Sequence, residues 1–178
     1  MGPVAQRDAP PDRRILALVS ELSELYIGVC GAGMATARPA DLRAADEVGR
    51  LVAEAGGVVV CGGLGGVMEA ACRGARSAGG VTVGLLPSDE RRTANPFVSV
   101  AIPTGLGELR NGLVVRAADA VVAIGGEWGT LSEIALAIKA GTPVVGVDTW
   151  DLGRGEIEVA PDPGAAVARA LVLARAHI

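Results

Sequence analysis

Glycine residues gather in three short runs of the sequence, and each run directly follows a stretch of apolar residues. The runs are Gly31–Gly33, Gly62–Gly66 and Gly125–Thr130. A glycine turn between a strand and a helix leaves the first N–H groups of the helix without partners, and such groups bind phosphate without any lysine. The types and spacing of these residues therefore point to a site for a phosphorylated ligand.

A purely structural explanation also exists for each run, because glycine permits a tight turn between a strand and a helix. For a single run that explanation would suffice. Three runs, two of which contain Gly-Gly pairs, favour a phosphate or nucleotide site. The residues predicted to contact this ligand are Gly31, Gly33, Gly62, Gly63, Gly65, Gly66, Val67, Gly125, Gly126, Trp128, Gly129 and Thr130.

Apolar stretches alternate with segments of helical periodicity, which is typical of a parallel sheet flanked by helices. Strands are expected at Leu25–Cys30, Val58–Cys61, Val81–Leu86, Phe97–Ile102, Ala120–Ile124, Val144–Val147 and Ile157–Val159. Helices are expected at Arg13–Glu24, from Asp41 as its cap to Ala55, at Val67–Ala78, at Leu106–Ala117, from Thr130 to Gly141, and at Pro163–Ala176. The sequence therefore predicts one Rossmann-like α/β domain over residues 13–178. Its sheet is doubly wound, mainly parallel and six- or seven-stranded, and residues 1–12 are expected to form a flexible leader.

Two common nucleotide-binding motifs are absent from the sequence. The dinucleotide motif G-x-G-x-x-G does not occur after the first predicted strand, and Cys61 and Gly62 stand where an acidic residue would hold a ribose. The G-x-x-x-x-G-K-[ST] motif of P-loop proteins does not occur either. We therefore expect neither a nicotinamide dehydrogenase nor a P-loop kinase.

Charge and composition exclude several other classes. The net charge of −4 gives no electrostatic reason to expect nucleic-acid binding. No apolar stretch approaches the roughly 20 residues of a membrane-spanning helix, so no membrane contact is expected. Cys30, Cys61 and Cys72 show no C-x-x-C pairing, which favours reduced thiols and a cytoplasmic location. His177 is the only histidine, so we expect no metal site, no histidine base and no required cofactor.

Two side chains near the third glycine run have more than one explanation. Thr130 and Glu133 have the spacing of a capping box, in which both side chains satisfy backbone groups at the start of a helix. From the residues alone, this structural role is the better explanation of Glu133. Trp128 could stack on a base or a pterin, or it could pack at an oligomer contact, and the sequence leaves both open.

Three segments together resemble the lonely-guy (LOG) family: Val60–Ala70, Ala78–Pro87 and Gly125–Glu133. The Gly-Gly-Val-Met-Glu-Ala sequence that begins at Gly65 is most similar to the branch that contains molybdenum-cofactor carrier proteins. The resemblance implies a Rossmann-like fold and a homodimer or homotetramer. It also implies a bound ligand that is a nucleoside monophosphate such as AMP, phosphate, or the molybdenum cofactor.

LOG enzymes hydrolyse the N-glycosidic bond of nucleoside 5′-monophosphates, and the resemblance implies catalytic roles for Arg110 and Glu133. Glu133 would stabilise positive charge on the ribose, and Arg110 would pair with the phosphate or with Glu133. The sequence departs from the enzymes at three places. Asn111 replaces a lysine, Ile124 replaces a proline, and Glu127-Trp128 fills a place where the enzymes have one residue. These departures favour binding over turnover, so a phosphoribohydrolase is the alternative function.

Members of the family have also been called lysine decarboxylases, but the sequence does not support that activity. Such enzymes hold pyridoxal phosphate on a lysine. The only lysine, Lys139, lies near the end of the helix that follows the third glycine run. At 1.5 Å per residue it is roughly 13 Å from the glycines. We therefore do not expect a pyridoxal-phosphate decarboxylase.

Overall fold

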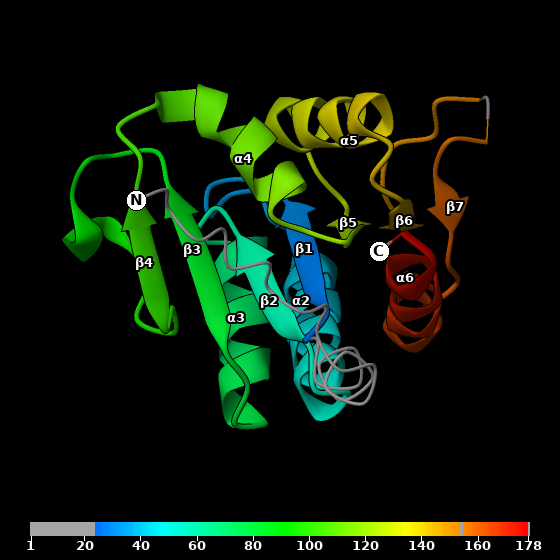
Figure 1. Ribbon diagram of the computed structural model, residues 1–178, viewed down its shortest axis with the longest axis horizontal. Helices are drawn as coiled ribbons and strands as arrows, with labels where there is room; N and C mark the ends of the chain where they lie inside the picture. Colours follow the sequence, from blue (N-terminus) through cyan, green and yellow to red (C-terminus); the bar gives the residue numbers. More distant parts are fainter. Residues whose placement is uncertain (1–23, 154, 178) are drawn as a thin grey trace, which may run out of the picture.

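The computed structural model describes residues 24–153 and 155–177. Within them, seven strands form one sheet in the order β4-β3-β2-β1-β5-β6-β7, and every neighbouring pair is parallel (Figure 1). The strands are β1 (Tyr26–Gly31), β2 (Val58–Cys61), β3 (Thr82–Leu86), β4 (Val100–Pro103), β5 (Ala120–Ile124), β6 (Val144–Val147) and β7 (Glu158–Val159). The helices are α2 (Pro39–Glu54), α3 (Val67–Ser77), α4 (Asn111–Arg116), α5 (Trp128–Ala140) and α6 (Pro163–His177). Short 3-10 helices occupy Arg91–Thr93 (η1) and Gly107–Arg110 (η2).

The chain builds the sheet outwards from β1 in two directions. It first adds β2, β3 and β4 on one side, and then returns to place β5, β6 and β7 on the other side. The strand order therefore reverses between β1 and β5, which is where open α/β sheets bind ligands, outside the carboxyl ends of the strands. The doubly wound Rossmann-like fold predicted from the sequence is confirmed.

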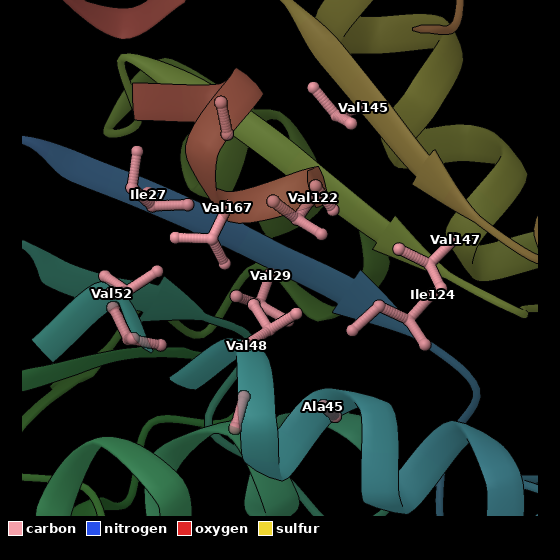
Figure 2. Close-up of a cluster of buried hydrophobic side chains, with 14 of the residues drawn as sticks. Ile27, Val29, Ala45, Val48, Val52, Val122, Ile124, Val145, Val147 and Val167 are labelled. Atoms are coloured by element: carbon pink, nitrogen blue, oxygen red, sulfur yellow. The ribbon is translucent and has the colours of Figure 1, made fainter. Parts of the chain in front are cut away.

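The larger core lies between the sheet and one layer of helices. Helices α2, α3 and α6 cover this face, and Figure 2 shows Ile27 and Val29 of β1 among valines of α2, α6 and neighbouring strands. Ile27, Val29 and Val48 have no exposed surface. Burial of each such side chain contributes roughly 1.5–3 kcal/mol, so this layer accounts for much of the stability.

Helices α4 and α5 cover the opposite face of the sheet. Val115 of α4 and Ile134 of α5 pack there against Cys30, Val121 and Ala123. The central strands are thus buried on both faces, which explains why they read as continuous apolar runs without polar alternation.

Several predicted boundaries are wrong, and three clear departures are at β4, at α4 and at the start of α5. Strand β4 begins at Val100 rather than Phe97, because the side-chain oxygen of Asn95 accepts a hydrogen bond from the Phe97 N–H (3.0 Å) and holds a turn there. The helix expected over 106–117 divides into η2 and α4, and Gly105 and Gly107 have φ values of +65° and +54°. Helix α5 begins at Trp128 rather than at Thr130.

Asp41 does not cap α2 in the predicted way. Arg38 is the N-cap, and Asp41 lies three residues further on, where its carboxylate accepts a hydrogen bond from the Arg38 N–H (3.0 Å). The leader and residues 13–23 of the helix predicted at Arg13–Glu24 lie outside the described residues. Of the helices that the structure describes, none combines the length and apolarity needed to cross a bilayer.

Candidate functional site

The glycine turn after β2 lies against a buried arginine. Arg110 stands at the end of η2, and only 5% of its surface is exposed. Its guanidinium group covers the backbone of Gly62 so closely that a Cβ atom there would collide with it. Glycine is therefore required at this position for the cation to reach the turn that leads into α3.

The guanidinium group of Arg110 is short of hydrogen-bond partners. Its Nε and Nη1 atoms are buried, and neither has an acceptor among the described residues. The nearest carboxylate oxygen, Oε1 of Glu133, is 3.7 Å from Nη1. That distance is an ion pair but too long for a hydrogen bond. Buried cations in proteins are normally paired and fully hydrogen-bonded, so this group keeps donors that an anionic ligand would satisfy.

Glu133 does not form the predicted capping box. Because α5 begins at Trp128 with Glu127 as its N-cap, Thr130 lies within the first turn and Glu133 within the second. Glu133 points inward and is 7% exposed. Burial raises the pKa of its carboxyl group to about 7, although the charge of Arg110 opposes the shift and the charge of Glu108 adds to it. Such perturbed carboxyl groups are common at ligand-binding and catalytic sites.

The turns after β2 and β5 leave several backbone N–H groups without acceptors. Within the described parts of the chain, no acceptor faces the N–H of Gly65 or Gly66, or those of Trp128, Gly129 and Thr130. These amides stand at the N-termini of α3 and α5, where the helix dipole favours an anion.

Three of the residues predicted to contact a ligand have N–H groups that are already engaged. The Gly125 N–H donates to the carbonyl oxygen of Val147 (3.1 Å). The Val67 N–H donates to the carbonyl oxygen of Ala32 (3.0 Å), and the Gly63 N–H donates to the sulfur of Cys61 (3.3 Å). Asn95 also holds this turn, because its N–H donates to the Gly63 carbonyl oxygen and its Nδ2 donates to that of Leu64, both at 2.9 Å. The β2–α3 turn is therefore fixed in place before any ligand binds.

The first glycine run packs against the second. A side chain at Gly31 would collide with the side chain of Val67, and one at Gly66 would collide with the backbone of Ala32 and Gly33. Gly33 itself has open space around its Cα atom. The structure thus brings the loops after β1 and β2 together, as expected for neighbouring strands.

The third run lies beside a different carboxylate. Gly125 has a φ of +52°, and a Cβ atom on it would lie 2.8 Å from Oδ1 of Asp41. Gly126, with a φ of +113°, lies over the side chain of Thr130. Both conformations favour glycine over any residue with a side chain.

A cavity of about 530 Å³ opens where the strand order reverses. Its lining residues are Ala32, Thr36, Arg38, Asp41, Gly125, Gly126, Glu127, Asp148, Thr149, Trp150 and Asp151. Four carboxylates and one guanidinium group face this cavity, and Arg110 and Glu133 are not among its lining residues. The cavity is therefore acidic. Gly125 and Gly126 belong to its lining, whereas Arg110 and the free amides at the starts of α3 and α5 lie outside it.

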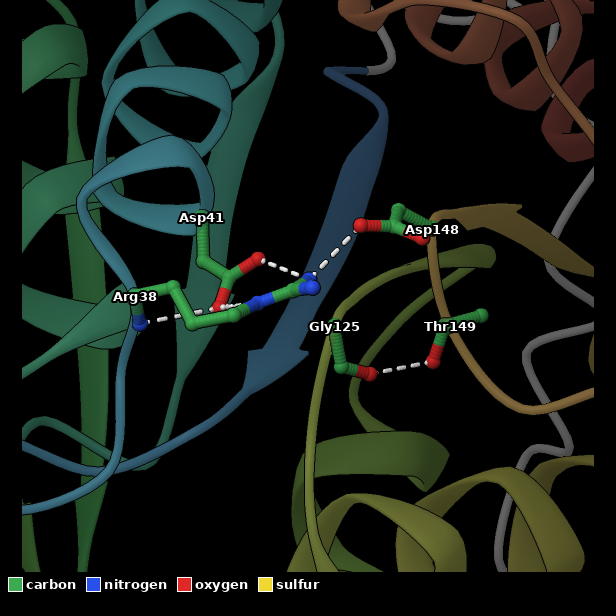
Figure 3. Close-up of polar contacts among 5 residues, drawn as sticks. All are labelled: Arg38, Asp41, Gly125, Asp148 and Thr149. Atoms are coloured by element: carbon green, nitrogen blue, oxygen red, sulfur yellow. Dashed lines mark hydrogen bonds and ion pairs between the residues drawn. The ribbon is translucent and has the colours of Figure 1, made fainter.

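Arg38 joins the two sides of the cavity mouth (Figure 3). Its guanidinium group donates to both carboxylate oxygens of Asp41 (2.6 and 2.9 Å) and to Oδ2 of Asp148 (2.7 Å). These bonds hold the pKa of Asp41 below its ordinary value. The Thr149 hydroxyl donates to the carbonyl oxygen of Gly125 beside them. Sequence reasoning missed Arg38 and Asp148 as residues of this region, and only the three-residue spacing of Arg38 and Asp41 hinted at a pair.

Two tryptophans meet beside the N-terminus of α5. The ring centroids of Trp128 and Trp150 are 5.6 Å apart with an interplanar angle of 38°, an arrangement favourable for aromatic rings. Trp128 is 75% exposed, and it also lines a groove of about 600 Å³ on the outer side of α4 and α5. Lys139 lies in the last turn of α5, at the end of the helix away from this glycine run.

Comparisons with known proteins agree with the fold described above. Residues 24–170 match the model of the SLOG cluster4 family. A molybdenum cofactor binding protein from Rippkaea orientalis has a structure with a TM-score of 0.81 and 37% sequence identity, covering 85% of this chain and 98% of that one. The molybdenum cofactor carrier protein of Chlamydomonas reinhardtii gives a TM-score of 0.77 and 36% identity, with 84% and 98% coverage. An uncharacterized protein of Archaeoglobus fulgidus is 45% identical over 120 residues, which are 67% of this chain and 78% of that protein.

Proposed function

The chain belongs to the SLOG cluster4 family, and from this premise we propose that it binds a phosphorylated small molecule at the glycine turns after β2 and β5. The ligand is a nucleoside monophosphate or the molybdenum cofactor. The observation that carries the proposal is the environment of Arg110, a buried cation placed directly against Gly62. Two of its nitrogens have no hydrogen-bond acceptor among the described residues. Together with the free amides at the starts of α3 and α5, it offers a phosphate both charge and hydrogen bonds.

Support for the molybdenum cofactor as one of the two ligand classes comes from the similar proteins. The proteins from Rippkaea orientalis and Chlamydomonas reinhardtii are described as binding or carrying the molybdenum cofactor. Each of these two proteins aligns with this chain over 98% of its own length, and the sequence identity is more than a third. The molybdenum cofactor and AMP both present a phosphate monoester, so the same glycine turns and Arg110 would hold either one.

The test is a binding panel with two matched variants. Purified protein is titrated with AMP, GMP and inorganic phosphate, and free base is measured in the same samples. Gly65→Asp places a carboxylate at the N-terminus of α3 and should weaken AMP binding by about 100-fold or more, because like charges repel at close range. Ala78→Asp adds the same charge at the exposed far end of α3, where φ is −94°, and should leave the affinity unchanged. Equal affinities in the two variants would remove this site.

A second function, hydrolysis of the N-glycosidic bond, is favoured by Glu133. A buried carboxylate beside a cation could stabilise positive charge that develops on the ribose. If the protein turns over AMP, Glu133→Gln should reduce turnover by roughly 10² while the affinity for AMP stays similar. If the wild-type protein binds AMP and releases no free base, hydrolysis is rejected and binding is the only function that remains.

We also propose that the protein is a homodimer or homotetramer. The outer side of α4 and α5 exposes large apolar side chains around the groove, among them Leu109 (81% exposed) and Trp128. Exposed apolar patches of this kind mark protein contacts. Light scattering on the purified protein should give a mass of two or four chains, and Leu109→Glu should lower it. The cytoplasmic location and the lack of nucleic-acid binding stay predictions from composition.

A further inference from the structure

Two of the three cysteines meet beneath the glycine turn after β2. Cys61 is the last residue of β2 and Cys72 lies in α3, and their sulfur atoms are 3.5 Å apart in a hydrogen bond. Neither side chain has exposed surface. The residues between them include the whole Gly62–Gly66 run. A bond between the two sulfurs would therefore close a loop around the proposed phosphate-binding turn.

The surroundings of the pair differentiate the two thiols. The pKa of Cys72 lies below its ordinary value because of the hydrogen bond with Cys61 and the nearby side chains of Asn95 and Thr82. The pKa of Cys61 is raised by the same hydrogen bond and by burial. Cys72 is thus the sulfur that becomes a thiolate first, and the thiolate is the reactive form. Cys30, by contrast, is buried with a raised pKa, and within the described residues it makes no hydrogen bond to another sulfur.

We propose that Cys61 and Cys72 form a two-electron redox site that hydroperoxides oxidise to a disulfide. The Cys72 thiolate attacks one oxygen of the peroxide, the O–O bond breaks, and the released hydroxide takes up a proton to become water. The sulfur of Cys61 then attacks the resulting sulfenic acid, the S–O bond breaks, and hydroxide leaves with the Cys61 proton as a second water. The dithiol loses two electrons and two protons, and one hydrogen peroxide becomes two waters.

Oxidation should reach the ligand site through the residues that hold the turn. The Gly63 N–H donates to the Cys61 sulfur, and Asn95, which lies beside Cys72, binds the carbonyl oxygens of Gly63 and Leu64. The sulfurs must move from 3.5 Å to about 2.05 Å to bond, which displaces both anchors. This step rests on the proposed function, because it assumes that the turn binds phosphate.

Burial makes the opening of the turn a condition for reaction. Since neither thiol is exposed, peroxide reaches them only when the turn and the start of α3 open transiently. A ligand bound to the turn would reduce that opening. AMP should therefore slow the oxidation of the two cysteines. It should not alter the oxidation of a small thiol compound that is added to the same sample as a standard.

The experiment counts thiols after treatment of the folded protein with hydrogen peroxide. The reaction is stopped, the protein is unfolded and alkylated, and its mass is measured by mass spectrometry. The number of alkylated cysteines should fall from three to one in the wild type and from two to none in Cys30→Ser, and dithiothreitol should restore it. Cys72→Ser should keep both of its thiols. Should that variant fail to fold, peptide mapping of the oxidised wild type must still find Cys61 joined to Cys72.

Two results would overturn the proposal. One is a wild-type protein that keeps all three thiols under peroxide, and the other is a loss of thiols that is equal in Cys72→Ser. The coupling is tested separately by the affinity for AMP, which should fall about tenfold on oxidation, equivalent to one hydrogen bond to the turn. An unchanged affinity would refute the coupling. If reduced protein fails to bind AMP, the proposed function fails, and the thiol count still decides the redox site.

Discussion

Arg38 and Arg110 occupy similar places in the fold but have opposite surroundings. The side chain of Arg38 is 54% exposed, yet it makes three hydrogen bonds of 2.6–2.9 Å to Asp41 and Asp148. The side chain of Arg110 is 7% exposed, yet its nearest carboxylate is 3.7 Å away and two of its nitrogens have no partner among the described residues. In a folded protein the buried cation has the greater need of partners.

The difference indicates separate roles for the two arginines. Around Arg38 the protein itself supplies the negative charge, so this cluster joins the start of α2 to the loop after β6. Around Arg110 the protein supplies a poorly placed carboxyl group whose own pKa is raised to about 7. A buried cation with a weakly ionised neighbour is well suited to an anion that comes from outside. The satisfied arginine is thus structural, and the unsatisfied one is a candidate ligand contact.

The sharpest test of this comparison is the pH dependence of stability near Arg110. Because the pKa of Glu133 is about 7 in the folded protein and 4.5 ordinarily, the folded state keeps a proton that the unfolded chain loses between these values. The free energy of unfolding should therefore decrease as pH rises from 4.5 to 7, by on the order of 3 kcal/mol, and then level off.

The measurement is urea denaturation of the wild type and of Glu133→Gln across that pH range. The difference between the two proteins isolates the contribution of Glu133 from that of other titrating groups. As pH rises, the free energy of unfolding of Glu133→Gln should increase relative to that of the wild type. A constant difference would mean that Glu133 titrates normally and that its carboxylate is well paired with Arg110.

The second test exchanges each arginine for alanine and measures ligand affinity. Arg110→Ala should weaken AMP binding by about 100-fold, as expected for the loss of a charge-assisted contact in a dry site. Arg38→Ala should change it by no more than about threefold, because the Arg38 guanidinium is already bound to two carboxylates. Similar losses in both variants would mean that the ligand uses the acidic cavity as well.

The smallest effects are expected within the Arg38 cluster, where burial separates its two carboxylates. Asp41→Ala removes a carboxylate that is 4% exposed and that binds both the side chain and the N–H of Arg38, so it should cost about 2 kcal/mol of unfolding free energy. Asp148 has a φ of +47°, which asparagine tolerates and alanine does not, so it is replaced by Asn. Asp148→Asn removes the charge of a carboxylate that is 74% exposed and should cost only a few tenths of a kcal/mol. Equal costs in thermal or urea unfolding would contradict a structural role for Asp41.

The elements of the sheet were predictable because burial leaves a clear pattern. Strands β2, β5 and β6 have the predicted bounds, since each is an apolar run ended by glycine or by a turn. Helix starts were less predictable. Trp128 and Gly129 gave no sign that α5 begins two residues before Thr130, and this shift is what turns Glu133 from a cap into a buried carboxyl group.

The contacts that define the candidate site could not be read from the sequence. The glycine runs predicted where free amides would gather, but not that Arg110 would cover Gly62. That contact depends on the path of η2 across the ends of the strands, which sequence spacing does not reveal. In the same way, Asp148 reaches Arg38 only because β6 lies beside β5 and leads its following loop back to the start of α2.

Trp128 and Trp150 are the only two tryptophans in the sequence. Trp128 begins α5, and Trp150, in the segment after β6, packs against it. Indole fluorescence from this protein therefore originates at one corner of the molecule, beside the glycine turn. Trp128 is 75% exposed and Trp150 is partly buried beside it, so the emission wavelength and its quenching report local polarity and ring stacking there. A spectrometer and the unmodified protein are sufficient to follow this corner in real time.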